Sequence, residues 1–197
     1  ALGAEEFGKI SLAQTFGIFI ILLFEFGSPI VLTREVSVKK QNRAELDLLI
    51  GKVFFFKLMI LPIVIIIVLL TLRFVPVFNK NPSYVLIVSI GAFFQGVSPS
   101  WYFQGIEKMK KIALSKFFFR FIGFIAIFFL VESKEDGWLV LLSYSLSSFF
   151  ICIYLVFELL KQVDTLRIPL VSQTVNIYRI CRSSFLITII PVFIQSA

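Results

Sequence analysis

Five residues with charged or amide side chains stand inside stretches of the sequence that are otherwise apolar: Glu25, Lys57, Gln95, Lys116 and Arg120. An ionisable group near the centre of a bilayer costs roughly 2.5–3.5 kcal/mol on insertion scales, so it usually faces a cavity or a partner. Such side chains can bind a ligand through charge and hydrogen bonds. We therefore take these five as the candidate binding residues.

No catalytic set accompanies them. The sequence has no histidine, which removes the commonest metal ligand and general base. Its two cysteines are Cys152 in an apolar run and Cys181 in a basic linker, and we expect neither a disulfide nor a metal pair. The acidic cluster around Asp136 is typical of a solvated turn. We expect no enzyme, no metal site and no cofactor.

Glu25 and Arg120 lie at similar depths from the same side of the membrane. Glu25 is seven residues from the end of its predicted span, roughly 10 Å deep, and Arg120 is about eight residues into its own, roughly 12 Å deep. Three arrangements fit: both line one water-filled cavity, the two pair, or Arg120 extends to the membrane surface. The last would also follow from misplaced span boundaries.

Lys57 and Lys116 are shallower, about 6 Å in, so extension to the surface explains either one alone. Lys116, however, precedes Arg120 by four residues, and Gly123 continues that helical face. The rest of this helix is covered by phenylalanines: Phe117, Phe118, Phe121, Phe124 and Phe128. A narrow polar stripe on an apolar helix is what a cavity wall requires.

Composition places these residues in a membrane protein. The chain has 197 residues, of which 58% are hydrophobic and 25 are phenylalanine. Soluble domains are about 45–50% apolar, so a water-facing globule could not cover this surface. The fold class is therefore all-α, a polytopic transmembrane helical bundle. The net charge of +7 lies in loops between apolar runs, which indicates membrane orientation and no nucleic-acid partner.

Apolar runs predict five complete spans and the start of a sixth. The spans are 10–32, 53–78, 83–106, 112–131 and 137–160, with 184–197 as the incomplete one. Within the loop 33–52, Ala44–Gly51 is predicted to be helical and to lead into the second span. Residues 161–183 form a linker, for which an amphipathic surface helix and an irregular tether are both open.

Charge predicts the orientation. The loops 33–52, 107–111 and 161–183 carry twelve Lys or Arg, against four at the opposite side of the membrane. The basic loops should therefore face the cytoplasm. Both ends of the sequence suggest that it is part of a longer protein.

The stretch Pro99–Met109 reads P-S-W-Y-F-Q-G-I-E-K-M. We expect its Trp101 and Tyr102 at the membrane interface, Gly105 in a turn, and the following lysines at a cytoplasmic surface. Leu2–Gly8 and Phe26–Glu35 are two further characteristic stretches, and their order and spacing extend through most of the chain. Together the three stretches resemble the O-antigen flippases (Wzx type) of polysaccharide biosynthesis.

The resemblance implies a fold of two six-helix lobes, twelve helices in all, around a central cavity. Residues 1–160 would be the N-terminal lobe without its first helix, 161–183 the cytoplasmic link between lobes, and 184–197 the start of the second lobe. Flippases of this family belong to a superfamily of multidrug, oligosaccharidyl-lipid and polysaccharide exporters. They are multi-pass proteins of the bacterial inner membrane.

The resemblance also implies a function: translocation of undecaprenyl-pyrophosphate-linked O-antigen units, by alternating access through a cationic lumen. Arg120, Lys116 and Lys57 would meet the pyrophosphate. The sugars would meet Gln95, Tyr102 and the serine set of the fifth span, namely Ser143, Ser145, Ser147 and Ser148. Glu25 would hold Arg120 when the site is empty. Expected partners are this lipid-linked oligosaccharide, membrane lipids and other O-antigen assembly proteins.

Three other functions fit part of the sequence. A multidrug exporter of the same superfamily should carry acidic residues deep in its spans, and only Glu25 qualifies. A polysaccharide polymerase should have a large extracytoplasmic loop, whereas the predicted outer loops are about five residues long. A non-transporting scaffold would not explain Arg120.

Overall fold

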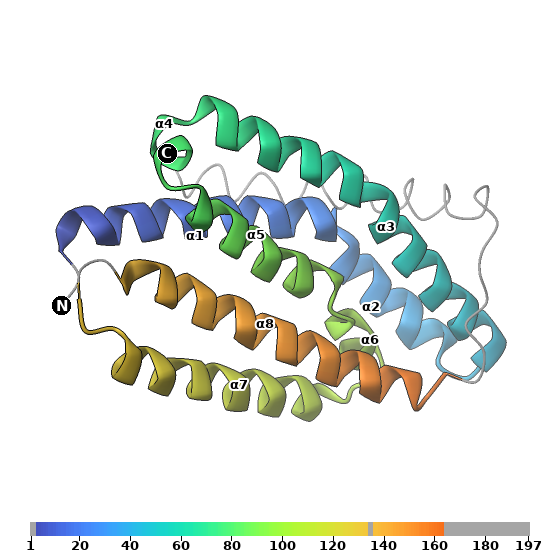
Figure 1. Cartoon of the computed structure of the whole chain (residues 1–197). Helices are drawn as coiled ribbons and strands as arrows, with labels where there is room; N and C mark the ends of the chain where they lie inside the picture. The colour runs from blue at the N-terminus through green and yellow to red at the C-terminus, as the bar shows by residue number, and fades with distance from the viewer. Residues whose placement is uncertain (1–2, 134–135, 164–197) are drawn as a thin grey trace.

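The computed structural model describes residues 3–133 and 136–163, and every regular element within these ranges is a helix. The all-α bundle predicted from the sequence is confirmed (Figure 1). The predictions for Cys181, for most of the linker 161–183 and for the sixth span lie outside the described residues. The helices are α1 (Ala4–Glu25), α2 (Ser28–Lys39), α3 (Arg43–Phe74), α4 (Pro76–Lys80), α5 (Pro82–Val97), α6 (Ser100–Gly105), α7 (Met109–Leu130) and α8 (Gly137–Leu160).

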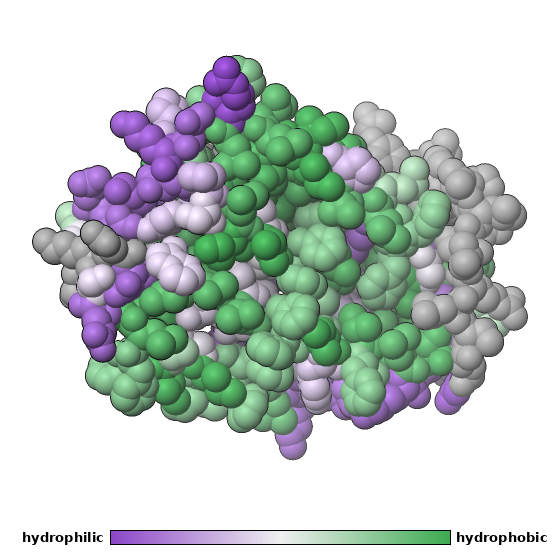
Figure 2. Space-filling model, in the orientation of Figure 1, coloured by the Kyte–Doolittle hydropathy of each residue, from purple (hydrophilic) through white to green (hydrophobic). Residues whose placement is uncertain are grey.

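Five helical stretches in this part of the chain are long and apolar enough to cross a membrane. They are Ala4–Lys39, Arg43–Phe74, Pro82–Gly105, Met109–Leu130 and Gly137–Leu160. The chain is therefore a polytopic membrane protein, as predicted. Apolar side chains cover most of the face shown in Figure 2, and hydrophilic residues gather toward its left end and lower right.

The first span differs from its prediction, 10–32. It begins at Ala4, breaks where Phe26 and Gly27 take left-handed φ angles of 42° and 68°, and continues as α2 to Lys39. The predicted loop 33–52 is therefore wrong: only three residues separate α2 from α3. The helix predicted over Ala44–Gly51 is confirmed, because α3 begins at Arg43.

The third span is also divided. Ser98 and Pro99 separate α5 from α6, since proline has no backbone N–H to continue the helix and restricts the residue before it. Residues 79–82, left between the second and third predicted spans, overlap a short helix, α4, which runs from Pro76 to Lys80, so only Asn81 separates α4 from α5. The second span accordingly ends at Phe74 rather than at residue 78.

Four helices form the main group of contacts: α5 packs against both α1 and α8, and α7 packs against α8. Figure 1 shows α3 at one edge of this group and α7 at the other. Two apolar cores stabilise it. One joins α2, α6, the start of α3 and the end of α8, and the other joins α1, α4, α5 and the second half of α3.

The aromatic residues of α6 belong to the first of these cores. Trp101 is 2% exposed and Tyr102 is 3% exposed, so both rings pack against protein, and their place at the membrane interface stays a prediction. Gly105 also differs from its prediction. A Cβ there would lie 2.6 Å from that of Val36, so glycine permits close packing of α6 on α2. The left-handed turn falls at Glu107, with φ 61°.

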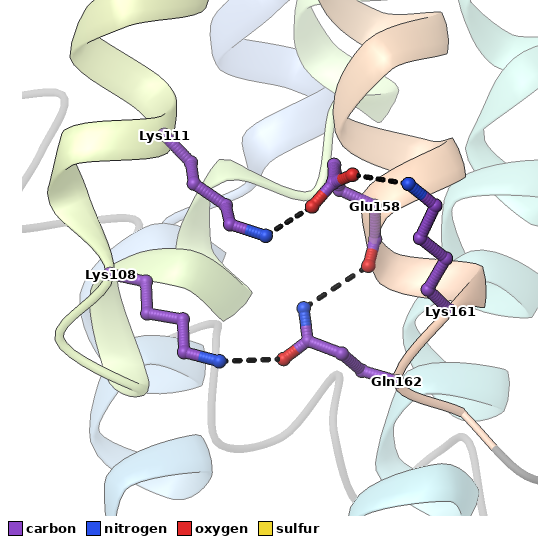
Figure 3. Close-up of polar contacts among 5 residues, drawn as sticks. All are labelled: Lys108, Lys111, Glu158, Lys161 and Gln162. Atoms are coloured by element: carbon purple, nitrogen blue, oxygen red, sulfur yellow. Dashed lines mark hydrogen bonds and ion pairs between the residues drawn. The ribbon is translucent and has the colours of Figure 1, made fainter.

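The basic segments meet at one end of the bundle, here called the basic end. Lys40, after α2, pairs with Glu107 before α7 at 3.3 Å. Figure 3 shows Glu158 of α8 between Lys111 and Lys161, with the Lys161 pair at 2.8 Å. Within the described residues, the predicted loops 33–52 and 107–111 thus meet at one end with Lys161, and the cytoplasmic orientation of this end stays a prediction.

Candidate functional site

A small cavity brings together four of the five candidate residues. Glu25 comes from the end of α1, Gln95 from α5, and Lys116 and Arg120 from α7. Its volume is about 50 Å³, room for a few water molecules. The remaining lining residues are Ser98, Ser100, Ser148 and Ile151.

The predicted stripe on α7 faces α8. A Cβ at Gly123 would lie 2.6 Å from Oγ of Ser147, so glycine allows the two helices to approach closely. The Ser147 hydroxyl lies 3.0 Å from the carbonyl oxygen of Phe119 and 2.8 Å from that of Ser143. This contact brings the side of α7 that carries Arg120 against α8, while the phenylalanines remain exposed: Phe117, Phe118, Phe121, Phe124 and Phe128.

Arg120 lies at the middle of its span. It follows Met109, the first residue of the 22-residue α7, by eleven residues, or about 16 Å. Its guanidinium carbon lies 5.7 Å from the centre of the Tyr144 ring. The Tyr144 hydroxyl in turn donates to Oε1 of Gln95 at 2.7 Å. A cation–π contact and one hydrogen bond thus connect α7, α8 and α5.

Glu25 does not pair with Arg120. Among the described residues no ion pair joins Glu25 to any cation. The charges of Lys57 and Lys116 nevertheless act on its carboxylate. The arrangement in which both residues line one cavity is the one that the structure contains, and direct pairing is not formed.

Lys57 occupies a different environment. It is 3% exposed, and its ammonium donates to the carbonyl oxygen of Gly96. It is not among the residues that line the cavity of Glu25. Extension of Lys57 to the membrane surface is therefore wrong: the side chain is enclosed between helices.

Sequence reasoning missed Tyr144, Ser98 and Ser100, whereas Ser148 is one of the serines expected to face the sugars. Ser148 belongs to the serine set of α8, and Tyr144 stands within that set, so the spacing along α8 was an available signal. Ser98 and Ser100 reach the cavity because Pro99 interrupts the helix between them. Tyr102, predicted on the sugar-facing wall, is instead buried in the core.

Two further hollows continue from this cavity, each of about 230 Å³. Arg120 lines the cavity and also the first hollow, with Gln14, Ser143 and Tyr144. Gln14 and Tyr144 then line the second hollow as well, beside Gly17. The first hollow thus shares Arg120 with the cavity and shares Gln14 and Tyr144 with the second hollow, which lies between α1, α5 and α8.

Two fixed cations, one carboxylate and several hydroxyls can hold an anionic group at membrane depth. Arginine can grip a phosphate through two parallel hydrogen bonds, and lysine adds a point charge. Within residues 3–133 and 136–163, no group of three or more metal-binding side chains lies together. Anion binding is therefore one function that these side chains could perform.

Comparison with known proteins adds the family. A family model described as "Polysaccharide biosynthesis protein" matches residues 1–195. The chain belongs to this family. The resemblance stated from the three sequence stretches is thereby confirmed.

Two relatives carry the name "Putative O-antigen transporter". The protein of Escherichia coli (strain K12) is 28% identical over 137 residues, which cover 68% of this chain and 32% of the relative. That of Shigella dysenteriae is 25% identical over 158 residues, covering 79% of this chain and 39% of the relative. The chain thus spans about a third of the length of these relatives. No solved structure is significantly similar to it.

Proposed function

We propose that this family member translocates undecaprenyl-pyrophosphate-linked O-antigen or polysaccharide repeat units across the bacterial inner membrane. The observation that supports this most is the convergence of Arg120 and Lys116 on one cavity at membrane depth. The names of the two relatives point to the same cargo. Since the chain spans a third of those relatives, the activity belongs to the whole protein, to which this bundle contributes one wall of the pathway.

The cargo accounts for the chemistry of the cavity. A pyrophosphate must leave water to cross the membrane, so it needs fixed cations where the dielectric constant is low. Arg120 offers a planar fork for two phosphate oxygens, and Lys116, one helical turn away, adds a second charge. When no ligand is bound, the negative charge of Glu25 partly balances the positive charges of Lys116 and Arg120.

Export of cationic drugs by a protein of the same superfamily is the second candidate. Glu25 in the cavity favours it, since a carboxylate attracts cations. Two cations line the same space, however, so its net charge is positive and repels a cationic drug. A polymerase is a weaker candidate, because this part of the chain holds no set of nucleophile and base.

The experiment is restoration of O-antigen on a strain that lacks its own flippase, with the protein carried at its full natural length. Arg120→Ala should lower surface O-antigen by about ten-fold or more, the cost of one charge-assisted bond. Arg120→Lys should lose part of the activity, because lysine keeps the charge and loses the fork. Lys116→Ala and Glu25→Gln should have milder effects.

Lys110→Ala is the matched control, since Lys110 is an exposed lysine at the basic end of the same helix. It should leave O-antigen unchanged. Protein amount is measured on the same membranes for every variant. If Arg120→Ala is present at normal amount and restores full O-antigen, the assignment of the cavity is wrong.

A further inference from the structure

The hollow beyond Arg120 differs in character from the cavity that holds Glu25 and Lys116. Arg120 is its one charged lining residue, and Gln14, Ser143, Tyr144 and Ser147 supply its other polar groups. We propose that this hollow is a saccharide subsite, in which Gln14 and Tyr144 bind the sugar next to the phosphate. The inference rests on the proposed function and names where its cargo places the sugar.

Continuity of the spaces supports this order. Arg120 separates the charged cavity from the hollow and borders both, so a group held there can place one end in each. Gln14 and Tyr144 then border the next hollow. On α1, Gln14 and Glu25 are eleven residues apart, about 16 Å, so the three spaces extend well beyond the size of a phosphate.

The chemistry of the lining suits a sugar. A sugar ring has an apolar face of C–H bonds and an edge of hydroxyls, so an aromatic ring and neutral amides or hydroxyls complement it. Tyr144 offers its ring, which Arg120 and Gln95 hold in place from two directions. Gln14 offers an acceptor and two donors, and Ser143 a hydroxyl.

Packing and hydrogen bonding within the described residues do not explain why position 14 carries a polar side chain. Gln14 is exposed at the eleventh position of the 22-residue α1, near the middle of that helix. Among the described residues it has no hydrogen-bond partner, and an unpaired amide in hydrocarbon is costly. Its neighbour Thr15, by contrast, bonds to the carbonyl oxygen of Ser11 at 2.9 Å. Gln14 therefore has a free amide where a sugar hydroxyl would lie.

The test compares two probes on the purified protein at its full natural length in lipid nanodiscs. Farnesyl pyrophosphate carries no sugar, and farnesyl pyrophosphate bearing N-acetylglucosamine carries one. Gln14→Leu should weaken binding of the sugar-bearing probe about ten-fold, the loss of one well-formed polar contact, and leave farnesyl pyrophosphate unchanged. Thr15→Val is the matched control and should change neither affinity. Arg120→Ala should weaken both.

The outcomes separate this inference from the proposed function. If Arg120→Ala weakens both probes while Gln14→Leu behaves as Thr15→Val does, the saccharide subsite is refuted and the phosphate site stands. Equal affinity of the unaltered protein for the two probes also refutes the subsite. If Arg120→Ala changes neither affinity, the proposed function itself fails.

Discussion

Lys57 and Arg120 are both cations at membrane depth, and the protein treats them in opposite ways. Lys57, on α3, is 3% exposed and donates to the carbonyl oxygen of Gly96. Arg120, on α7, is exposed, lies over the ring of Tyr144 and borders two spaces. The Lys57 ammonium is bound within the protein, whereas the Arg120 guanidinium remains available to a ligand.

The difference follows from the surroundings of the two helices. The region around Lys57 is closed by the close approach of α5 to α1, where Gly96 meets Phe24. Helix α7 contacts mainly α8, so much of its length has no protein neighbour in this part of the chain. A membrane-embedded charge therefore indicates a ligand site when the packing around it is open, and a structural bond when it is closed.

The largest expected loss of stability comes from a substitution in the closed region around Lys57. A Cβ at Gly96 would lie 2.5 Å from the Cβ of Phe24, whose side chain is fully buried. Gly96→Ala should therefore separate α5 from α1 and destabilise the protein by about 3 kcal/mol, as overpacking does. Thermal unfolding in detergent measures this. Gly8→Ala, with no atom within 4 Å of the new Cβ, should not lower stability, and equal losses would contradict the packing argument.

Lys57→Met should give the next largest effect. It retains most of the volume and removes the donor to the buried Gly96 carbonyl, at a cost of about 2 kcal/mol. The same substitution at Arg120 should cost less than about 1 kcal/mol, the value of a cation–π contact at an exposed site. Thermal unfolding of both variants checks the comparison. A larger loss for Arg120→Met would reverse the roles assigned to the two cations.

A smaller loss of stability is expected when the ion pair that connects α7 to α8 is removed. Glu158 joins α8 to α7 through Lys111, and its carboxylate is 13% exposed. Glu158→Gln should lower stability by about 0.5–1 kcal/mol, since ion pairs near the surface contribute little. Glu35→Gln is the control, because Glu35 pairs with Lys39 within one helix and holds no second helix. An effect as large as that of Lys57→Met would mean that polar contacts, and not apolar packing, position α7.

The membrane class and most of the candidate site could be predicted from the sequence. These predictions depend on the hydropathy and periodicity of single helices and not on how the helices pack together. Lys116, Arg120 and Gly123 share a face because of helical periodicity, and that face does line the cavity. The meeting of Glu25 with Gln95 was not specified in this way, since it depends on how α1 packs against α5. Both residues were nevertheless identified, because polar groups are rare in such spans.

The errors come from contacts between elements far apart in sequence. Hydropathy does not indicate which face of a span is covered by protein, so the burial of Trp101 and Lys57 between helices was not predicted. Tyr144 was missed because its role depends on Arg120 and Gln95, on two other helices. The break at Phe26 was missed although Gly27 and Pro29 mark it, because apolar residues continue on both sides of it and were read as one span.

The central claim is that Arg120 lies in an open, water-accessible space and Lys57 does not. The most direct measurement places single cysteines at these two positions, in a background without Cys152 and Cys181, and follows reaction with a charged, water-soluble thiol reagent in the membrane. Arg120→Cys should react at least about ten times faster than Lys57→Cys, because the thiolate forms and reacts where water has access. Equal rates at the two positions, or no reaction at position 120, would contradict the account.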